Sequence, residues 1–160
     1  MKAMVVYDSV FGNTEQIAQA IGRALGSPED VAIIRVDNVK PEQLTGLKLL
    51  IVGSPTRGFR PTPAISNFLK SIPKNGLRGV KVAAFDTRVT EHEMKSVFFM
   101  PIVVGIFGYA AKPISERLEK EGGERIIQPE GFFVEGTEGP LKEGELERAA
   151  AWARQIIAAQ

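Results

Sequence analysis

The chain passes from strand to helix within Val5-Val6-Tyr7-Asp8-Ser9-Val10-Phe11-Gly12-Asn13-Thr14-Glu15-Gln16. An apolar, β-branched run comes first, a loop rich in hydroxyl and amide side chains follows, and a helical pattern begins at once. The first turn of a helix presents unpaired N–H groups and the positive end of the helix dipole. This loop therefore suits an anion such as a phosphate.

Further apolar runs predict a parallel sheet covered by helices. Strands are predicted at 3–7, 31–36, 47–52 and 80–85, with a last strand over 124–128 and 132–134 that is interrupted at 129–131. Helices are predicted after the first loop, at 63–71, from about 91 with a break at Pro101, at 112–120 and from about 143. Because strands alternate with helices and several strands are apolar on both faces, we predict an α/β fold. It would be one doubly wound domain spanning residues 1–160.

Local patterns add finer expectations. Asn13 with Gln16, and Thr90 with Glu93, match the spacing of a helix capping box. Spacing of three and four residues places Leu146, Ala150, Ala153 and Ile157 on the inner face of the last helix.

Three loops leave the carboxyl ends of the first, third and fourth strands. They are Ser9–Thr14, Ser54–Arg60 and Asp86–Thr90, and all three are rich in small, hydroxyl-bearing or arginine residues. Ligands of doubly wound sheets lie outside the carboxyl ends of the strands. We therefore expect the three loops to converge on one binding site.

The first loop, Ser9-Val10-Phe11-Gly12-Asn13-Thr14, resembles the phosphate-binding loop of flavodoxins, and the order of elements resembles that family over essentially the whole chain. The resemblance implies a flavodoxin-like five-stranded parallel sheet of order 2-1-3-4-5 and flavin mononucleotide (FMN) as cofactor. Residues 9–14 would hold the phosphate. In physical terms Gly12 permits a tight turn, and Ser9 and Thr14 supply hydroxyl donors.

By the same resemblance, the second and third loops would flank the isoalloxazine ring. The residues concerned are Pro55, Thr56, Arg57, Gly58 and Phe59 on one side, and Asp86, Thr87 and Arg88 on the other. Flavodoxins commonly stack a Trp and a Tyr on the ring, and these loops contain neither. Phe59 is the only aromatic candidate in these two loops, with core packing as its alternative role.

The ring loops are also basic where flavodoxins are usually acidic. Arg57, Arg60 and Arg88 all fall in them. A guanidinium near the ring would stabilise added electrons. We therefore expect a less negative semiquinone/hydroquinone potential than in strongly acidic flavodoxins.

Composition excludes several classes of site. The chain has no Cys and a single His, His92, which excludes disulfides, a thiolate nucleophile and a Cys- or His-rich metal site. Twenty basic residues against 19 acidic ones, without a dense basic run, argue against nucleic acid as a partner. We predict no signal peptide and no membrane span, and we expect the protein to be cytoplasmic. The apolar segment 97–108 is a candidate contact for a homodimer or a redox partner.

These observations favour an FMN-binding protein that shuttles electrons between redox partner proteins. No catalytic acid, base or nucleophile is evident, and His92 follows the third loop as a surface residue or a proton donor. One alternative is an NAD(P)H-dependent FMN quinone or flavin reductase. Another is a flavodoxin-like interaction module without flavin.

Overall fold

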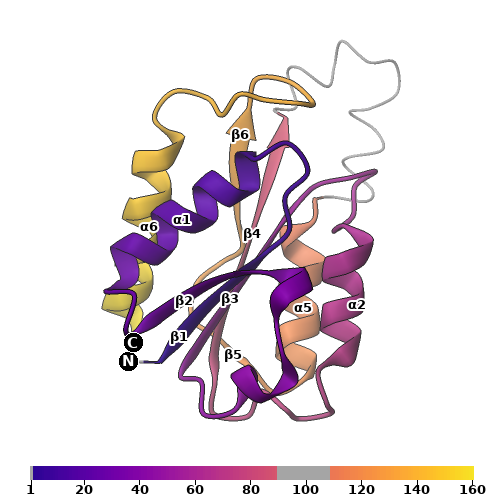
Figure 1. Ribbon diagram of the computed structural model, residues 1–160, viewed down its shortest axis with the longest axis vertical. Coiled ribbons are helices and arrows are strands. Elements are labelled where there is room, and N and C mark those ends of the chain that lie inside the picture. The colour runs from indigo at the N-terminus through magenta and orange to yellow at the C-terminus, as the bar shows by residue number, and fades with distance from the viewer. Residues whose placement is uncertain (1, 90–108) are drawn as a thin grey trace.

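A twisted parallel sheet forms the middle layer of the protein (Figure 1). The structure is a computed structural model, and it describes residues 2–89 and 109–160. The strands are β1 (Ala3–Tyr7), β2 (Val31–Arg35), β3 (Leu49–Pro55), β4 (Lys81–Val89), β5 (Glu124–Arg125) and β6 (Glu130–Val134). They lie in the order β2-β1-β3-β4-β5, and β6 also pairs with β4. The predicted strand order is therefore confirmed.

Helices cover both faces of the sheet, as predicted (Figure 1). On one face lie α1 (Asn13–Leu25) and α6 (Glu145–Ala159), and on the other lie α2 (Pro63–Ser71) and α5 (Ala111–Lys120). Two short 3₁₀ turns, η1 (Val36–Asn38) and η2 (Pro41–Leu44), connect β2 to β3. Successive residues of a strand point to opposite faces. Val5 and Ile51 accordingly join the core under α1 and α6, whereas Val6 and Val52 join the core against α2 and α5.

Strands β3 and β4 run further than the sequence predicts. The third strand was expected to end at Val52 and the fourth at Phe85, but they continue to Pro55 and Val89. Pairing explains the extension, because Ser54 lies opposite Asp86 and the end of β4 is also paired with β6. Polar residues that resemble a loop in the sequence are therefore held in the sheet.

The last predicted strand is divided into β5 and β6, and the interruption falls at other residues than predicted. Strand β5 pairs with the start of β4, and β6 pairs with Phe85–Val89. The break falls at residues 126–129, so Glu130 and Gly131 belong to β6.

The predicted inner face of α6 is wrong at two positions. Leu146 and Ile157 are exposed to 41% and 43%, whereas Trp152 and Ile156 are buried; Ala153 is buried as predicted. The large Trp152 side chain sets the rotation of the helix. Its ring makes edge-to-face contacts with Phe85 and Phe132, at centroid distances of 6.2 and 6.1 Å.

Some sequence predictions lie outside the described residues. They are the capping box at Thr90, the helix from about 91, the role of His92 and the apolar contact segment 97–108. Within the described residues, no helix is both long enough and apolar enough to cross a membrane.

Gly53 of β3 leaves room for the ring of Phe85. A Cβ atom at Gly53 would lie 2.0 Å from the Phe85 ring, which in turn contacts Phe132 and Trp152. The interior is close-packed, so the ring has little room to move away.

We expect Gly53→Ala to lower the free energy of unfolding by about 1–3 kcal/mol, the usual cost of overpacking a core. Urea denaturation followed by tryptophan fluorescence measures the change, because Trp152 is the only Trp. Gly136→Ala is the matched control, since a Cβ atom at Gly136 would meet nothing within 4 Å. Equal stability of the two variants would contradict the prediction.

Candidate functional site

A cavity of about 310 Å³ opens at the carboxyl ends of β1, β3 and β4. All three predicted loops contribute to it, as the parallel sheet requires. Of the predicted site residues, those that line it are Ser9, Val10, Phe11, Asn13, Thr14, Pro55, Thr56, Arg57, Gly58, Phe59, Thr87 and Arg88. Gly12 and Asp86 do not line it. Val89, which lies within the predicted third loop, also lines it. Val134 and Thr137 line it without having been predicted, because no sequence pattern indicates that the strand break brings β6 beside β4.

Ser9 organises the first loop. Its hydroxyl oxygen accepts hydrogen bonds from the N–H groups of Gly12 (3.1 Å) and Glu15 (3.4 Å). Gly12 has a φ of 93°, a left-handed conformation that glycine adopts without strain. These bonds fold the loop over the first turn of α1.

The predicted capping role of Asn13 is wrong. Gly12, not Asn13, precedes the first helical residue, and no side chain caps that position. The Asn13 amide group instead donates to the carbonyl of Glu138 (3.1 Å). A Cβ atom on Gly139 would lie 2.6 Å from the same amide group, so Asn13 packs tightly against the loop that follows β6.

Several N–H groups of the first loop remain available. Within the described part of the chain, the N–H groups of Phe11, Asn13 and Thr14 have no hydrogen-bond acceptor. Asn13 and Thr14 are the first two residues of α1, where helical N–H groups lack an internal partner. The loop thus keeps donors at the positive end of a 13-residue helix.

Two threonines connect this loop to the sheet. The hydroxyl groups of Thr14 and Thr87 lie 2.8 Å apart and are buried. The carbonyl of Thr87 accepts a hydrogen bond from the N–H group of Thr56 (3.0 Å), which fixes the second loop to β4. Thr87 therefore contacts both the first loop and the second loop.

The second loop reverses through a tight turn. Arg57 and Arg60 exchange two backbone hydrogen bonds, of 2.8 and 3.1 Å, across Gly58 and Phe59. Both central residues have positive φ, 55° and 68°, as a type I′ turn requires. Phe59 is half-buried and lines the cavity, so its alternative role as a core residue is not what the structure shows.

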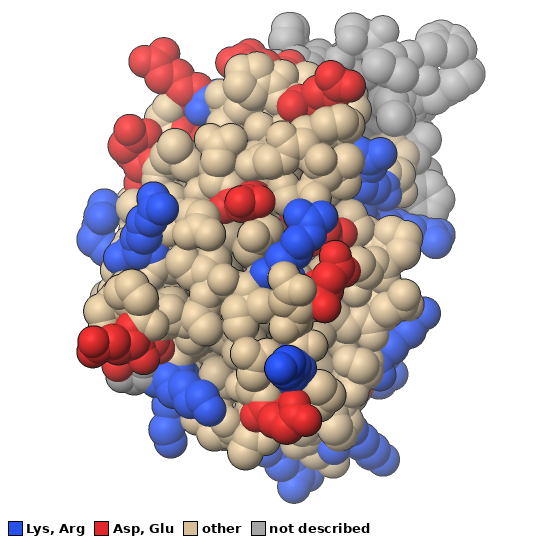
Figure 2. Space-filling view, viewed as in Figure 1, with Lys and Arg blue, Asp and Glu red and all other residues tan. Residues whose placement is uncertain are grey.

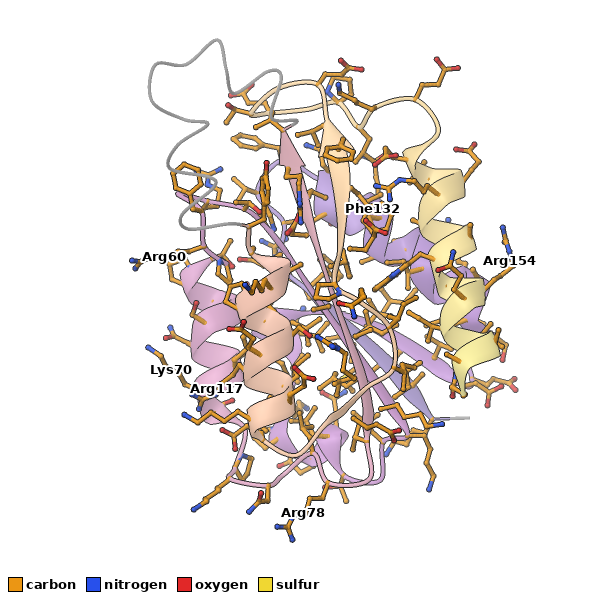
Figure 3. All side chains as sticks on the ribbon, turned by 180° about the vertical axis from the view of Figure 1, so that it is seen from behind. Arg60, Lys70, Arg78, Arg117, Phe132 and Arg154 are labelled. Carbon is orange, nitrogen blue, oxygen red and sulfur yellow. The ribbon has the colours of Figure 1, made fainter. Side chains whose placement is uncertain are left out.

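The three loop arginines have different environments. Arg57 lines the cavity, with its guanidinium carbon 5.7 Å from the centre of the Phe11 ring. No carboxylate within the described ranges pairs with Arg57. Arg60 projects outward beside the start of α2 (Figure 3). Of the three, only Arg88 forms an ion pair with a carboxylate in the described part of the chain.

Arg88 forms that ion pair with the buried carboxylate of Asp86. Its Nε and one terminal nitrogen each donate at 2.7 Å, and the N–H of Ala111 adds a third bond at 2.9 Å. Burial raises the pKa of Asp86, and the bonds and charge of Arg88 oppose that rise. The guanidinium also lies 3.7 Å from the centre of the Tyr109 ring. A Cβ atom on Gly131 would collide with the guanidinium, so glycine leaves the room that Arg88 fills.

A further ion pair lies behind the first loop, at residues that the sequence analysis did not single out. Arg35 donates to the Asp8 carboxylate (3.1 Å) and to the Ser9 carbonyl (2.8 Å). Asp8 in turn accepts the Ser9 N–H at 2.9 Å. The sequence could have indicated this ion pair, because Arg35 ends the strand that neighbours β1 and is paired with Tyr7, the residue before Asp8.

The cavity therefore fits an anionic ligand with an aromatic body. Its lining residues include hydroxyl groups, free N–H donors and two arginines, and no Asp or Glu is among those that the structure describes. Phe11 and Phe59 are the aromatic residues among its described lining residues. Trp152 does not line it, since its side chain is buried in the core. The departure from a Trp and Tyr pair, predicted from the sequence, therefore holds for the described lining.

Comparisons with known proteins agree with this arrangement. A family model described as flavodoxin matches residues 5–152. Flavodoxin 2 from Bacillus cereus is 22% identical, with 100% of each chain covered and a TM-score of 0.77. A flavodoxin from the domain Archaea is 25% identical over 99% of this chain and 97% of its own, with a TM-score of 0.73. Rubredoxin oxygen:oxidoreductase from Desulfovibrio gigas is 20% identical over 99% of this chain but 35% of its own, with a TM-score of 0.72.

We expect Arg88→Met to destabilise the protein by about 3 kcal/mol at pH 7, because it leaves the Asp86 carboxylate buried and unpaired. The loss should shrink as the pH falls. Burial raises the pKa of Asp86 and Arg88 opposes that rise, so the variant without Arg88 has a still higher folded-state pKa. The folded variant therefore favours the protonated acid more strongly than the wild type does, and it loses more stability as the pH rises through its folded pKa.

Urea titrations at pH 5 and pH 8 measure this dependence. Asp86→Asn combined with Arg88→Met is the control, because it removes the charge that titrates. A destabilisation of Arg88→Met that is the same at both pH values would contradict the assignment.

Proposed function

The chain belongs to the flavodoxin family, whose members bind FMN, and we propose that it is an FMN-binding protein that passes electrons between redox partners. The observation that carries the proposal is the phosphate cradle at the start of α1. Free N–H groups at Phe11, Asn13 and Thr14 converge there with the hydroxyl groups of Ser9 and Thr14. Neutral donors of this kind at a helix start suit a phosphate ester.

In this proposal the remaining loops hold the ring of FMN. Residues 55–59 would lie on one side of it, and Thr87, Arg88, Val89 and Val134 on the other. Asp86 would act indirectly, by fixing the Arg88 side chain. Gly12 would act through its left-handed turn. When bound, FMN supplies the electron-accepting chemistry, and the protein orients it and sets its potential.

An electron carrier needs no acid or base from the protein, and the described lining of the cavity agrees with that requirement. Among the described residues that line it there is no carboxylic acid, imidazole or amine that could donate or accept a proton. Proton transfer by a positioned side chain is a common requirement of reactions on organic substrates. An NAD(P)H-dependent reductase and a flavin-free interaction module are the two alternatives that measurement must separate.

The rim of the cavity suits a partner with an acidic surface. Val10 and Phe11 are exposed to 51% and 45%, and Arg57 lies over the Phe11 ring. Exposed apolar side chains beside unpaired cations are typical of a transient docking site. We infer that redox partners approach this rim with carboxylates opposite Arg57.

We expect Thr14→Val to weaken FMN binding about 10- to 100-fold, because it removes a hydrogen bond to a charged group worth about 1.5–3 kcal/mol. Binding of riboflavin, which lacks the phosphate, should weaken much less, because it is affected only by loss of the Thr14–Thr87 contact. Quenching of flavin fluorescence during titration of the flavin-free protein measures both affinities. Thr45→Val is the matched control, since Thr45 is an exposed threonine outside this cavity.

The outcomes separate the three functions. Failure of the purified chain to bind FMN at any concentration would favour the flavin-free module. Steady oxidation of NADH or NADPH by the FMN-loaded protein, without any protein partner, would favour the reductase.

Arg57 should raise the reduction potential of bound FMN, because its positive charge stabilises added electrons. An exposed charge interaction of about 0.5–1 kcal/mol corresponds to roughly 20–40 mV for one electron. We therefore expect Arg57→Ala to make the potential more negative by about that amount. Redox titration measures it, with Arg154→Ala on the outer side of α6 as the equal-charge control (Figure 3). Identical potentials for the two variants would rule out this role of Arg57.

A further inference from the structure

A second and larger cavity lies at the opposite end of the sheet. Its volume is about 630 Å³, within the range of roughly 300–1,000 Å³ that small-molecule sites occupy. It lies between η2, the end of α2 and the turn that leads into β4. The first cavity is built from the carboxyl ends of strands and the residues that follow them, whereas this one is built from residues that precede β3 and β4.

The floor of this second cavity is apolar. Leu47, Phe68, Ile72 and Val80 line it and are buried, with exposures between 3% and 9%. Val39 and Leu44 form half-buried walls. A ligand with a hydrocarbon body would therefore cover apolar surface here, with the usual gain from burial.

The mouth of the cavity is cationic. Lys48 and Arg78 line it and are exposed, and no Asp or Glu is among its described lining residues. The ammonium group of Lys2 lies beside the lining residue Thr45, to whose carbonyl it donates at 2.6 Å. Neither Lys48 nor Arg78 has a carboxylate partner within residues 2–89 and 109–160.

Backbone pairing explains why the cations gather. Lys48 donates its N–H to the carbonyl of Lys2, so these two residues lie side by side on neighbouring chain segments. Ala3 and Leu49 face α1 and α6, whereas Lys48 lines the cavity on the other face of the sheet. Arg78 lies at the same end of the molecule (Figure 3). On the face shown in Figure 2, Lys and Arg side chains likewise gather at that lower end.

We propose that this cavity binds a small amphipathic anion, with a hydrocarbon body on the apolar floor and one acidic head group at Lys48 and Arg78. Both a carboxylate and a phosphate monoester fit this description. An ammonium group and a guanidinium both donate to such heads, and the guanidinium can do so with two parallel bonds. The site is separate from the FMN cavity and does not depend on the proposed function.

The test uses the FMN-loaded full chain and decanoate, decyl phosphate and decan-1-ol as probes, each below its aggregation limit. Isothermal titration should give saturable one-to-one binding for at least one of the two anions and much weaker binding for the neutral alcohol. Shortening the better anion should weaken binding by about two- to fourfold per methylene group, as expected for partly to fully buried chain. Amide NMR signals of Gly46 and Gly79 should shift, and those of Thr14 and Thr87 should not.

Lys48→Glu should weaken binding of the anion about three- to tenfold, the expected range for reversing a charge at an exposed mouth. Lys74→Glu is the matched control, because it makes the same change in net charge on a nearby exposed lysine that does not line the cavity. Tighter binding of either decanoate or decyl phosphate supports the proposal and identifies the head group.

Three results would overturn the proposal. One is binding of decan-1-ol as tight as that of both anions. Another is an equal effect of Lys48→Glu and Lys74→Glu. The third is a doubling of mass in light scattering at the probe concentrations used, which would assign the apolar floor to a contact between two copies of the chain.

Discussion

The site depends on the pairing of β4 between two parallel neighbours. Strand β3 holds one side of β4 as far as Thr87, and β6 holds the other side from Phe85 to Val89. Since side chains alternate along a strand, Phe85 and Thr87 point toward α1, and Asp86 and Arg88 point toward α5. One strand thus supplies the aromatic core, the link to the first loop and the buried ion pair.

The two ends of the sheet differ in the kind of group that they offer to an anion. At the carboxyl end, the donors are mostly N–H groups and hydroxyl groups held by Ser9 and Thr87, whose geometry the backbone fixes. At the amino end, the charges are flexible side chains such as Lys48 above an apolar floor. Fixed donors favour a ligand of defined shape, whereas flexible cations tolerate several acidic heads.

The sequence predicted the fold and most of the cavity lining because both follow from simple patterns. Buried parallel strands are continuous apolar runs, and their carboxyl ends must meet at one edge. The sequence could not predict that Ser54 and Asp86 lie within strands, because their pairing partners are distant in the chain and the residues themselves are polar. It missed Val134 and Thr137 for a similar reason. The role of Asn13 was misjudged because a capping pattern does not reveal that the Glu138 carbonyl lies beside it. The rotation of α6 depended on Trp152, whose aromatic partners come from β4 and β6.

At Phe59, the residue that would best stabilise the turn differs from the residue that best serves the cavity. Its φ of 68° is one that non-glycine residues adopt at a cost of about 1 kcal/mol or more. Glycine at this position would relax the turn between Arg57 and Arg60, but it would also remove an aromatic wall of the cavity. Selection for a more stable protein and selection for tighter ligand binding would therefore favour different residues here.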